Sequence, residues 1–519
     1  MVNDVEPRGE ARAGRAAALV GGGTALLATA VLHTFASWFP FPPIGVADVV
    51  IEITPGPIAT RSIELLGHLA QPLLVLVTTA VFLGIAAELG RLLPRLARAV
   101  PGGAPGAALI LELPLAAVAV AAVRPSSSVT VGRGGYALLL LPVIALGAWV
   151  TSRTFARLTT VDTTTAGATP LDRERRMILR GMLIGATGLL VGWTGAGRAL
   201  LRRTDPGETP LDVAVPSPAR APSPAPSDTA FQGLRGLAPR LTPLEDFYVI
   251  DTELLDPQVD ADTWSLEIGG LVDRPFTLTY DELLGLPAVE LFSTLECISN
   301  EVGGDLISTA RWTGVPLRSL LDRAGVGDAG LEVVATAVDG YADSIPLKDA
   351  MADHTLVVLG MNGRTLPTSH GFPARLLVPG RYGMKQPKWL GALEVVDLPF
   401  EGYWVERGWS KAAIVKTMSR IDATIDEGAQ VVVAGVAFAG TRGISRVEIS
   451  ADGGTSWADA ELETALSPLT WRRWRFAFPA TSSATVVVRG TDGEGRVQTQ
   501  AVAPPHPDGA SGYDRRSVG

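Results

Sequence analysis

The sequence predicts a multidomain membrane protein with an N-terminal α-helical transmembrane bundle, an α+β domain and a C-terminal β-sandwich. Three observations support this fold class. Apolar residues are concentrated in about the first 200 of the 519 residues, and a tract rich in proline, alanine and serine follows. Near residue 410 the pattern changes from mixed helices and strands to regularly spaced strands. A chain of this length also favours several domains.

Composition narrows the function classes. The chain is 47% hydrophobic but only 19% charged and 6% aromatic, which suits a membrane segment joined to a soluble part. The net charge of −9, without a basic stripe, argues against a nucleic-acid partner. The single cysteine, Cys297, excludes an intramolecular disulfide and any zinc or haem site of the Cys-x-x-Cys type.

Five apolar segments have roughly the 20-residue length that a bilayer requires. They cover residues 17–40, 63–89, 106–123, 135–152 and 177–201. The third is the weakest, because Glu112 and Pro114 lie near its middle. An intramembrane carboxylate is usually buried against other helices or functional. We therefore expect a transmembrane domain of about five helices over residues 1–203.

Arginines in the short connecting segments predict the orientation of the bundle. They gather before the first span and after the second and fourth, whereas the alternate loops carry few. Basic residues favour the cytoplasmic side. The N-terminus is therefore expected in the cytoplasm and the chain after the fifth span outside it. Three arginines count against this orientation: Arg198, Arg202 and Arg203.

The segment "RRMILRGMLIGATGLLVGW" (175–193) resembles a twin-arginine export signal. Arg175 and Arg176 precede a basic residue and a modest apolar run. Such signals are addresses read by a receptor, and their pathway exports folded proteins, which can carry a cofactor acquired in the cytoplasm. The alternative is an ordinary cytoplasmic arginine cluster before a helix.

Four further regions follow the membrane part. Residues 204–230, rich in proline, alanine and serine, are expected to form an extended linker. Residues 231–405 alternate short β-like runs with helical stretches, which predicts an α+β domain. Residues 406–504 carry alternating strands with Asp-Gly turns, which predicts an immunoglobulin-like β-sandwich. The tail, 505–519, is expected to be disordered.

Cys297 lies in "TLECISNEVGG" (294–304) and has three interpretations. It is a buried structural thiol, a catalytic nucleophile, or a soft thiolate ligand to a metal. A nucleophile needs a base, and only His354 and His370 lie in the predicted α+β domain, neither in a recognisable cysteine-hydrolase signature. A metal whose other ligands come from a cofactor needs only one protein thiolate, which agrees with a single cysteine.

The sequence around Cys297 favours the third interpretation. Several motifs, in this order, resemble the sulfite oxidase family of molybdenum enzymes over roughly residues 240–500. They are "TLECISN", "ARWTGVPLRSLL" (310–321), "DGYADSIPL" (339–347), "MNGRTLPTSHGFPARLLVPGRYGMKQPKWLGALEV" (361–395), "SRVEISADGGTSW" and "WRRWRF". The resemblance implies a sulfite-oxidase-type molybdopterin-binding domain followed by a dimerisation domain. It also implies two-electron oxygen-atom transfer on a small molecule.

The resemblance implies a role for particular residues. Cys297 matches the molybdenum ligand, Tyr341 an active-site tyrosine, and Arg472 an arginine directed towards the substrate anion. The positions that match the molybdopterin pocket are Asn300, Arg311, His370, Arg375 and Lys388. A phosphate-bearing cofactor needs fixed bidentate donors, which arginine supplies. Taken alone, each cation would be a solvated surface charge and Tyr341 an ordinary strand tyrosine.

The chain departs from true sulfite oxidases in two places. They follow Cys-x-x-Asn with basic residues, whereas this chain has Glu301, whose carboxylate would repel an oxyanion. The segment "TPLEDFYVIDTELLDP" (242–257) looks more like the bacterial periplasmic branch, which includes methionine-sulfoxide reductase catalytic subunits. The substrate therefore stays open.

A metal that changes by two electrons needs an electron partner, for which a membrane quinone or a cytochrome is the expectation. His33 and His68 are expected at the outer ends of the first two spans, where they could ligate a b-type haem. The alternative is a pair of interfacial histidines beside an anchor that binds no haem. A homodimer is a family expectation. The alternative function is a membrane-anchored binding or scaffold protein that keeps the fold without turnover.

Overall fold

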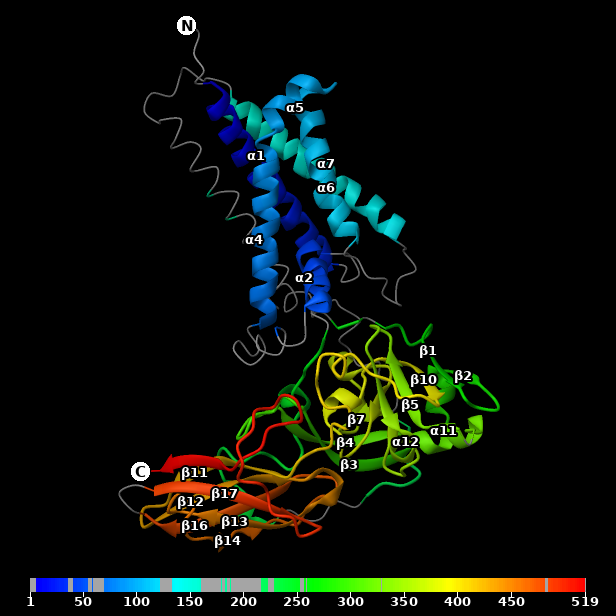
Figure 1. The fold of residues 1–519 in the computed structure, drawn as a ribbon, viewed down its shortest axis with the longest axis vertical. Helices are drawn as coiled ribbons and strands as arrows, with labels where there is room; N and C mark the ends of the chain where they lie inside the picture. Colours follow the sequence, from blue (N-terminus) through cyan, green and yellow to red (C-terminus); the bar gives the residue numbers. More distant parts are fainter. Residues whose placement is uncertain are drawn as a thin grey trace. The chain divides into compact units, whose positions relative to one another are not determined.

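The computed structural model describes residues 6–35, 41–54, 58, 70–121, 133–159, 179, 183, 187, 216–222, 228–252, 256–257, 259–327, 329–480 and 484–518. The chain forms two compact units (Figure 1). The first comprises Met1–Glu208 with Glu253–Gln258, and the second comprises Thr209–Thr252 with Val259–Gly519.

The first unit is a bundle of apolar α-helices, drawn in blue to cyan in Figure 1. Its described helices are α1 (Glu6–Phe35), α2 (Pro42–Ile53), α4 (Ala70–Gly90), α5 (Leu93–Ala99), α6 (Gly103–Ala121) and α7 (Arg133–Thr159). Among the described residues, four segments are long and apolar enough to cross a bilayer: Gly9–Leu32, Leu73–Gly90, Gly103–Ala121 and Gly135–Thr159. These match the first four predicted spans. The fifth, 177–201, lies outside the described residues apart from three isolated positions.

Small residues set the packing of α1 against its neighbours. Gly14 and Gly90 face each other, so that a β-carbon on either glycine would clash with the carbonyl group of the other. A β-carbon on Gly21 would likewise clash with the side chain of Thr151 in α7. Association of helices in lipid depends on such close approach. The glycines of α1 therefore allow it to contact both α4 and α7.

Two parts of the bundle were difficult to predict. The third span is a continuous helix, α6, although Pro114 lies inside it. The helix α2 was not predicted, because its 12 residues are too short for a span. It begins at Pro42 and Pro43, where the missing N–H of proline costs nothing.

Two sheets form the α+β part of the second unit, which confirms the predicted mixed domain. The first has the strand order β2-β1-β10-β5-β6, and the second has the order β3-β4-β7-β8 with β9 paired to β7. Strand β1 runs parallel to β10, whereas the other pairs are antiparallel. The strands are β1 (Ser265–Gly270), β2 (Phe276–Thr279), β3 (Val289–Glu296), β4 (Ile307–Pro316), β5 (Glu332–Ala337), β6 (Ala342–Pro346), β7 (Leu356–Met361), β8 (Arg364–Thr365), β9 (Arg375–Leu377) and β10 (Leu390–Val396).

Short helices complete the core of this domain. They are α10 (Tyr280–Leu284), α11 (Leu317–Ala324) and α12 (Leu347–Ala350). In α11 the apolar residues at three- and four-residue spacing are buried and join the residues of β1, β5 and β10 in one cluster. Gly325, with φ at 73°, ends this helix in the left-handed conformation that glycine adopts readily. Residues of β4, β7 and β9 also belong to this cluster, so the core packs the two sheets of the domain together.

The C-terminal part is a β-sandwich of two four-stranded antiparallel sheets, ordered β11-β12-β16-β15 and β14-β13-β17-β18. Apolar residues from both sheets form one core around Trp474, which is fully buried. The strands are β11 (Met418–Asp426), β12 (Gln430–Phe438), β13 (Ile444–Ser450), β14 (Ala458–Asp459), β15 (Glu461–Leu462), β16 (Arg472–Pro479), β17 (Ala484–Asp492) and β18 (Asp514–Val518). The sandwich is as predicted, and its immunoglobulin-like class stays a prediction.

The prediction that residues 505–519 are disordered is wrong for the described part. Strand β18 pairs with β17 along its whole length, from Val488↔Asp514 to Ala484↔Val518. The Asp514 carboxylate also accepts the backbone N–H of Ile421 (2.8 Å), at an irregularity in β11. The polar sequence "DRRSV" carries no apolar pattern. Its order comes from backbone pairing at a sheet edge, which composition does not report.

The predicted linker is partly attached to the sheet. Ala219 N–H donates to the carbonyl oxygen of Ala288 (2.8 Å), and Glu290 N–H donates to that of Arg220 (2.9 Å). These bonds place the extended segment beside the edge of β3. Residues 219–220 therefore pair with the start of β3, the strand that leads to Cys297.

Replacing Asp514 by alanine should destabilise the sandwich by about 1–3 kcal/mol, because the buried N–H of Ile421 loses its acceptor. The urea midpoint of unfolding measures this change. Arg515→Ala, at the exposed neighbouring position, is the matched control and should change stability by less than about 0.5 kcal/mol. Equal losses in the two variants would contradict the role of Asp514.

Candidate active site

Cys297 directly follows β3 and is 9% exposed. Its backbone N–H donates to the carbonyl oxygen of Leu306 (2.9 Å), and Asn300 N–H donates to the carbonyl oxygen of Cys297 (3.1 Å). The Sγ atom lies 2.9 Å from Oγ of Ser299. Burial raises the pKa of the thiol, while the contacts with Ser299 oppose this shift. The thiol is thus held in a closed loop between β3 and β4.

The side chain of Asn300 holds this loop together. Its Nδ2 donates to Oε1 of Glu296 (3.0 Å), and its Oδ1 accepts the backbone N–H of Leu306 (3.0 Å). A β-carbon on Gly304 would lie 2.6 Å from Oδ1 of Asn300, so glycine is required there. The structure thus gives Asn300 a positioning role in the loop, and its predicted contact with a cofactor stays a prediction.

Glu296 is a buried carboxylic acid next to the thiol. It is 5% exposed, and Oε2 has no hydrogen-bond partner among the described residues. Burial raises its pKa to about 7, against the lowering effects of Asn300 and of the positive charge of Arg420. Arg420 comes from β11 of the sandwich and donates to the carbonyl oxygen of Gly304 (2.7 Å). The sandwich therefore contributes a cation to the Cys297 loop.

Three tyrosines are electrostatically coupled to Cys297. The negative charge of a Cys297 thiolate contributes to raising the pKa of Tyr248, Tyr341 and Tyr382, in each case after burial as the largest cause. Tyr341 Oη donates to the carbonyl oxygen of Met384 (2.7 Å), and Tyr382 Oη accepts the N–H of Lys416 (3.2 Å). The structure thus brings the predicted Tyr341 to the neighbourhood of Cys297.

Tyr248 was not predicted as a site residue. Its hydroxyl is buried and has no hydrogen-bond partner in the described part of the chain. A β-carbon on Gly383 would lie 3.1 Å from this hydroxyl and 3.6 Å from the carbonyl oxygen of Glu296. Tyr248 lies in the segment "EDFYV", which resembles the bacterial periplasmic branch of the family. That resemblance does not by itself mark the tyrosine as a site residue.

His370, Arg375 and Lys388 lie together on one side of the site, which is cationic because Arg375 and Lys388 are positively charged. His370 ends η4 (Thr368–His370), and Arg375 begins β9. Arg375 Nη1 donates to the carbonyl oxygen of His370 (3.1 Å), and Lys388 Nζ donates to that of Ser369 (2.8 Å). Lys388 also forms an ion pair with Asp251. The structure thus brings together three of the five predicted cofactor residues.

Desolvation dominates the electrostatics of this cationic side. Burial lowers the pKa of His370 to about 4, with smaller contributions from the charges of Arg375 and Lys388. Burial also lowers the pKa of Arg375 to about 10. The Nε atom of Arg375 has no hydrogen-bond partner among the described residues, and its guanidinium lies 5.4 Å from the ring of Trp312. A fixed, partly unsatisfied guanidinium is suited to an anion.

Two predicted arginines have different surroundings. The Arg311 side chain is 37% exposed, lies 3.6 Å from Glu290 and covers Gly363. Arg472, in β16, donates to the carbonyl oxygens of Glu463 (2.9 Å) and Ile444 (3.1 Å), both in the sandwich. The described contacts do not connect Arg472 to the Cys297 loop. Arg420 is the sandwich arginine that reaches this loop, and the sequence analysis missed it.

The two histidines predicted as haem ligands are not described in full. His33 belongs to α1, two residues before the helix ends, and its side chain lies outside the described residues. His68 also lies outside them. Haem binding stays a prediction.

Comparisons with known proteins agree with this geometry. The model of the oxidoreductase molybdopterin binding domain matches residues 253–404, and that of the Mo-co oxidoreductase dimerisation domain matches residues 408–503. Sulfite oxidase of Gallus gallus is 30% identical over 321 residues, which cover 51% of this chain and 69% of that protein. The chain belongs to the sulfite oxidase family. The resemblance seen in the sequence is therefore confirmed.

Other relatives of the family differ in name and coverage. Mitochondrial sulfite oxidase of Rattus norvegicus is 32% identical over 303 residues, and the chain spans only 55% of its length. A putative protein-methionine-sulfoxide reductase subunit YedZ1 of Azospira oryzae is 34% identical over 153 residues, covering 30% of this chain and 56% of that protein. A solved structure of the sulfane dehydrogenase SoxCD from Paracoccus pantotrophus matches with a TM-score of 0.46 and 24% identity, covering 51% of this chain and 77% of that one.

The residues present fit the molybdenum cofactor of the family. Cys297 offers a buried sulfur ligand of the soft type that molybdenum accepts. Tyr248 Oη and Arg375 Nε are buried donors that no described residue uses. The two groups flank one aromatic cluster, because the Tyr248 ring stacks on Phe247, Phe247 contacts Trp312, and the Arg375 guanidinium lies over Trp312. Unused donors at one place indicate a ligand that accepts their hydrogen bonds.

A buried ion pair supports the Tyr341 side of the site. Lys385 Nζ lies 2.6 Å from Oδ1 of Asp343, and the two side chains are 2% and 0% exposed. Lys385 follows Met384, whose carbonyl oxygen accepts the Tyr341 hydroxyl, and Asp343 follows Tyr341 by two residues. The Tyr341–Met384 hydrogen bond and the Lys385–Asp343 ion pair therefore both join the start of β6 to η5 (Gly383–Lys385).

Lys385→Met should lower the free energy of unfolding by about 3–5 kcal/mol, because Asp343 is left as an uncompensated buried charge. The double variant Asp343→Asn with Lys385→Met should recover much of this loss. The measurement is the urea midpoint of each variant, with Lys348→Met at an exposed position as the control. A single variant as stable as the control would show that the pair contributes little.

The low pKa of His370 predicts a pH-dependent stability in protein without cofactor. The folded state binds a proton at His370 only near pH 4, whereas the unfolded state binds it near pH 6.5. Stability is therefore fully present above about pH 6.5 and falls as the pH drops towards 4, by on the order of 3 kcal/mol. His370→Gln should flatten this part of the curve, measured by chemical unfolding at several pH values. Identical curves for both proteins would contradict the prediction.

Proposed function

We propose that the chain is a membrane-anchored molybdenum-cofactor oxidoreductase that catalyses two-electron oxygen-atom transfer on a small oxo-substrate outside the cytoplasmic membrane. The observation that carries the proposal is the buried Cys297 thiol in the same domain as two buried donors that no described residue uses, Tyr248 Oη and Arg375 Nε. A β-carbon on Gly383 would contact both the Tyr248 hydroxyl and the carbonyl oxygen of Glu296, the residue before Cys297. When bound, the cofactor would supply the two-electron redox chemistry. The residues of the chain bind it, orient it and select the substrate.

Different side chains of the chain would hold the metal, bind the pterin and contact the substrate. Cys297 would hold the metal through its sulfur, and Arg375, His370 and Lys388 would bind the pterin and its phosphate. The hydrogen bonds of Asn300 keep the sulfur fixed relative to β3. Tyr341 can donate a hydrogen bond to the substrate or to an oxo group if it releases the carbonyl oxygen of Met384.

A neutral oxo-compound such as a sulfoxide is the substrate class that the local charges favour. Glu301 is exposed and Glu296 is buried, and both lie within four residues of Cys297. Carboxylates at these positions oppose an oxyanion. Reduction of a sulfoxide takes up two electrons and two protons, breaks the sulfur–oxygen bond, and releases a sulfide and one water molecule. A relative named as a putative methionine-sulfoxide reductase subunit supports this direction.

Sulfite oxidation is the second candidate, because several relatives are named sulfite oxidases. The two candidates are separated by assays of the purified full-length protein. Methyl-sulfoxide compounds are tested with a reduced dye as electron donor, and sulfite is tested with a soluble oxidant. Turnover of sulfite alone would overturn the proposed substrate class. Loss of both activities in a molybdenum-loaded protein would favour the scaffold function.

The cellular arrangement follows from the membrane helices. The four apolar helices support an anchored protein. The arginine distribution supports an N-terminus in the cytoplasm and a molybdenum domain outside, and the segment 175–193 would direct twin-arginine export. The dimerisation domain supports a homodimer. A membrane quinone or a cytochrome would exchange the electrons.

Cys297→Ala should abolish turnover and leave the fold intact, because it removes the sulfur ligand but keeps a small buried side chain. Molybdenum content by elemental analysis, turnover and the unfolding midpoint should be measured on the same preparation. Stability should change by about 1 kcal/mol. An active, metal-loaded variant would overturn the mechanism.

Arg375→Met should weaken retention of the cofactor roughly ten- to hundredfold, since a hydrogen bond to a charged group is worth about 1.5–3 kcal/mol. The molybdenum content after extensive dialysis measures the effect. Arg364→Met, at an exposed position of β8, is the matched control and should retain the metal. If the two variants retained molybdenum equally, Arg375 would not be a cofactor-binding residue.

A further inference from the structure

The strand that leads to Cys297 is held by the sandwich. Strand β3 pairs with β4, and three hydrogen bonds also reach it from the loop between β15 and β16. They join Ser467 Oγ to the carbonyl oxygen of Phe292 (2.7 Å), the N–H of Thr294 to the carbonyl oxygen of Leu469 (3.0 Å), and the N–H of Trp471 to Oγ1 of Thr294 (2.8 Å). The sandwich therefore fixes the end of β3, shortly before the thiol.

A second contact from the sandwich reaches the chain after Cys297. Arg420 in β11 donates through Nη1 to the carbonyl oxygen of Gly304 (2.7 Å) and through Nε to Oδ1 of Asp422 (2.6 Å). The other carboxylate oxygen of Asp422 accepts the N–H of Ala238 (3.0 Å). The side chains of Arg420 and Asp422 are only 12% and 5% exposed. The guanidinium that meets the loop is therefore itself held in place by a buried carboxylate.

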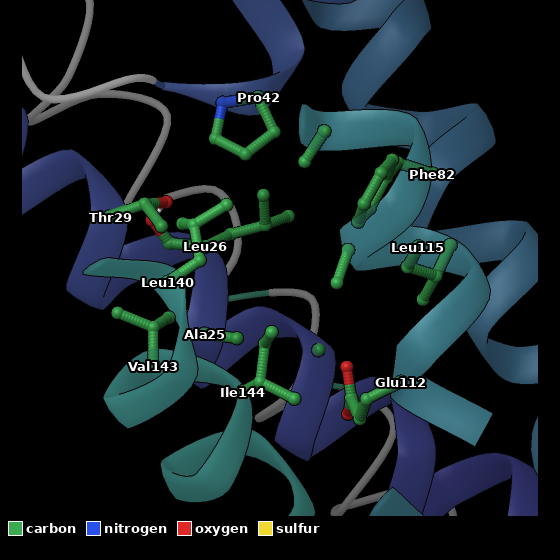
Figure 2. A pocket seen from close by; sticks show the side chains of 13 residues that line it. Ala25, Leu26, Thr29, Pro42, Phe82, Glu112, Leu115, Leu140, Val143 and Ile144 are labelled. Atoms are coloured by element: carbon green, nitrogen blue, oxygen red, sulfur yellow. Dashed lines mark hydrogen bonds between the residues drawn. The ribbon is translucent and has the colours of Figure 1, made fainter. Parts of the chain in front are cut away.

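This contact differs from two other buried polar contacts of the chain. Figure 2 shows Glu112 among apolar side chains of the membrane helices, and its partner Thr151 belongs to the same bundle. Lys385 and Asp343 likewise pair within the α+β part. Arg420 instead joins the sandwich to the loop that carries the thiol. Its contact therefore bears on the position of the thiol.

Position matters at this thiol because a metal ligand must be held closely. A functional group has to stay within about 0.5 Å of its productive geometry. Groups that orient a ligand without touching the metal commonly change metal affinity roughly ten- to hundredfold when they are replaced. Asn300 holds the loop from inside, whereas the sandwich holds the chain on both sides of Cys297.

We propose that the sandwich is part of the molybdenum site, and that Arg420 is a positioning residue that holds the Cys297 sulfur where it ligates the metal. The inference rests on the proposed function, because it assigns this sulfur to molybdenum. Arg420 acts through Gly304 on the loop and does not need to touch the metal, the pterin or the substrate. Without its guanidinium, the carbonyl oxygen of Gly304 loses its donor and Asp422 loses this ion pair, so the loop opens more readily.

Hydrogen–deuterium exchange of the purified full-length protein, read by mass spectrometry, tests this role. Arg420→Met should speed exchange in the peptide that covers residues 297–306 at least about tenfold, because it removes a charged hydrogen-bond donor from the loop. Arg442→Met is the matched control. Arg442 also donates to one carboxylate, that of Asp492 (2.8 Å), and to one carbonyl oxygen, that of Val415 (3.0 Å), but neither belongs to the loop. Arg420→Lys keeps the charge and a donor, so its exchange should be intermediate.

The molybdenum content of the same samples, made in a host that builds the cofactor, is the second measurement. After extensive dialysis it should fall roughly tenfold in Arg420→Met and stay near the wild-type value in Arg442→Met. Equal loop exchange in the two methionine variants would overturn the proposal, and so would faster exchange with unchanged molybdenum content. A wild-type protein without molybdenum would contradict the proposed function, and the exchange rates would still decide whether Arg420 positions the loop.

Discussion

The side-chain amide of Asn300 is the constraint on which the candidate site depends. It connects the end of β3, through Glu296, to the start of β4, through the N–H of Leu306. Because both ends of one short side chain are used, the Cys297 loop has little freedom to open. The sandwich strengthens this constraint: Arg420 donates to Gly304, and a β-carbon on Gly303 would press on Asp514 at 3.0 Å. The loop that holds the thiol is therefore fixed from both domains.

This arrangement has a cost in stability that the rest of the domain offsets. The thiol of Cys297, the carboxyl group of Glu296 and the hydroxyl of Tyr248 are all buried, and the last two have a polar atom with no partner among the described residues. Each such atom destabilises the folded state by about 1–3 kcal/mol. The large apolar core around α11 and the paired Lys385 and Asp343 lie close by in the same domain. A bound ligand that used the free donors would recover part of the cost, which is the energetic argument for a cofactor at this place.

Much of the fold could be predicted, because its signals are local. Four of the membrane helices could be predicted from the apolar runs. The central residues of the site could be predicted from the motifs around Cys297, His370 and Arg375. The missing parts depend on contacts between distant segments. Arg420 and Asp514 reach the loop from the sandwich, 123 and 217 residues after Cys297 in the sequence. Tyr248 precedes the domain's first strand. Arg472 was assigned by motif, but its guanidinium is bound to carbonyl oxygens of the sandwich. Sequence spacing does not report such pairings.

The charges of the site separate into two sides, and this separation bears on the substrate. His370, Arg375 and Lys388 gather on one side, where burial already depresses the pKa of His370 and Arg375. The buried, partly unsatisfied guanidinium of Arg375 and the ammonium group of Lys388 favour an anion, whereas the low pKa of His370 keeps its ring neutral. The anion that the family supplies is the cofactor itself. Around Cys297 the side chains are instead Glu296 and tyrosines, and burial raises the pKa of Glu296 to about 7. An anionic substrate approaching this side would meet a carboxyl group, and the guanidinium of Arg420, which reaches this loop, is already bound to Asp422 and to the carbonyl oxygen of Gly304. A neutral oxygen donor would meet no such repulsion, so the charge pattern supports the proposed sulfoxide over sulfite.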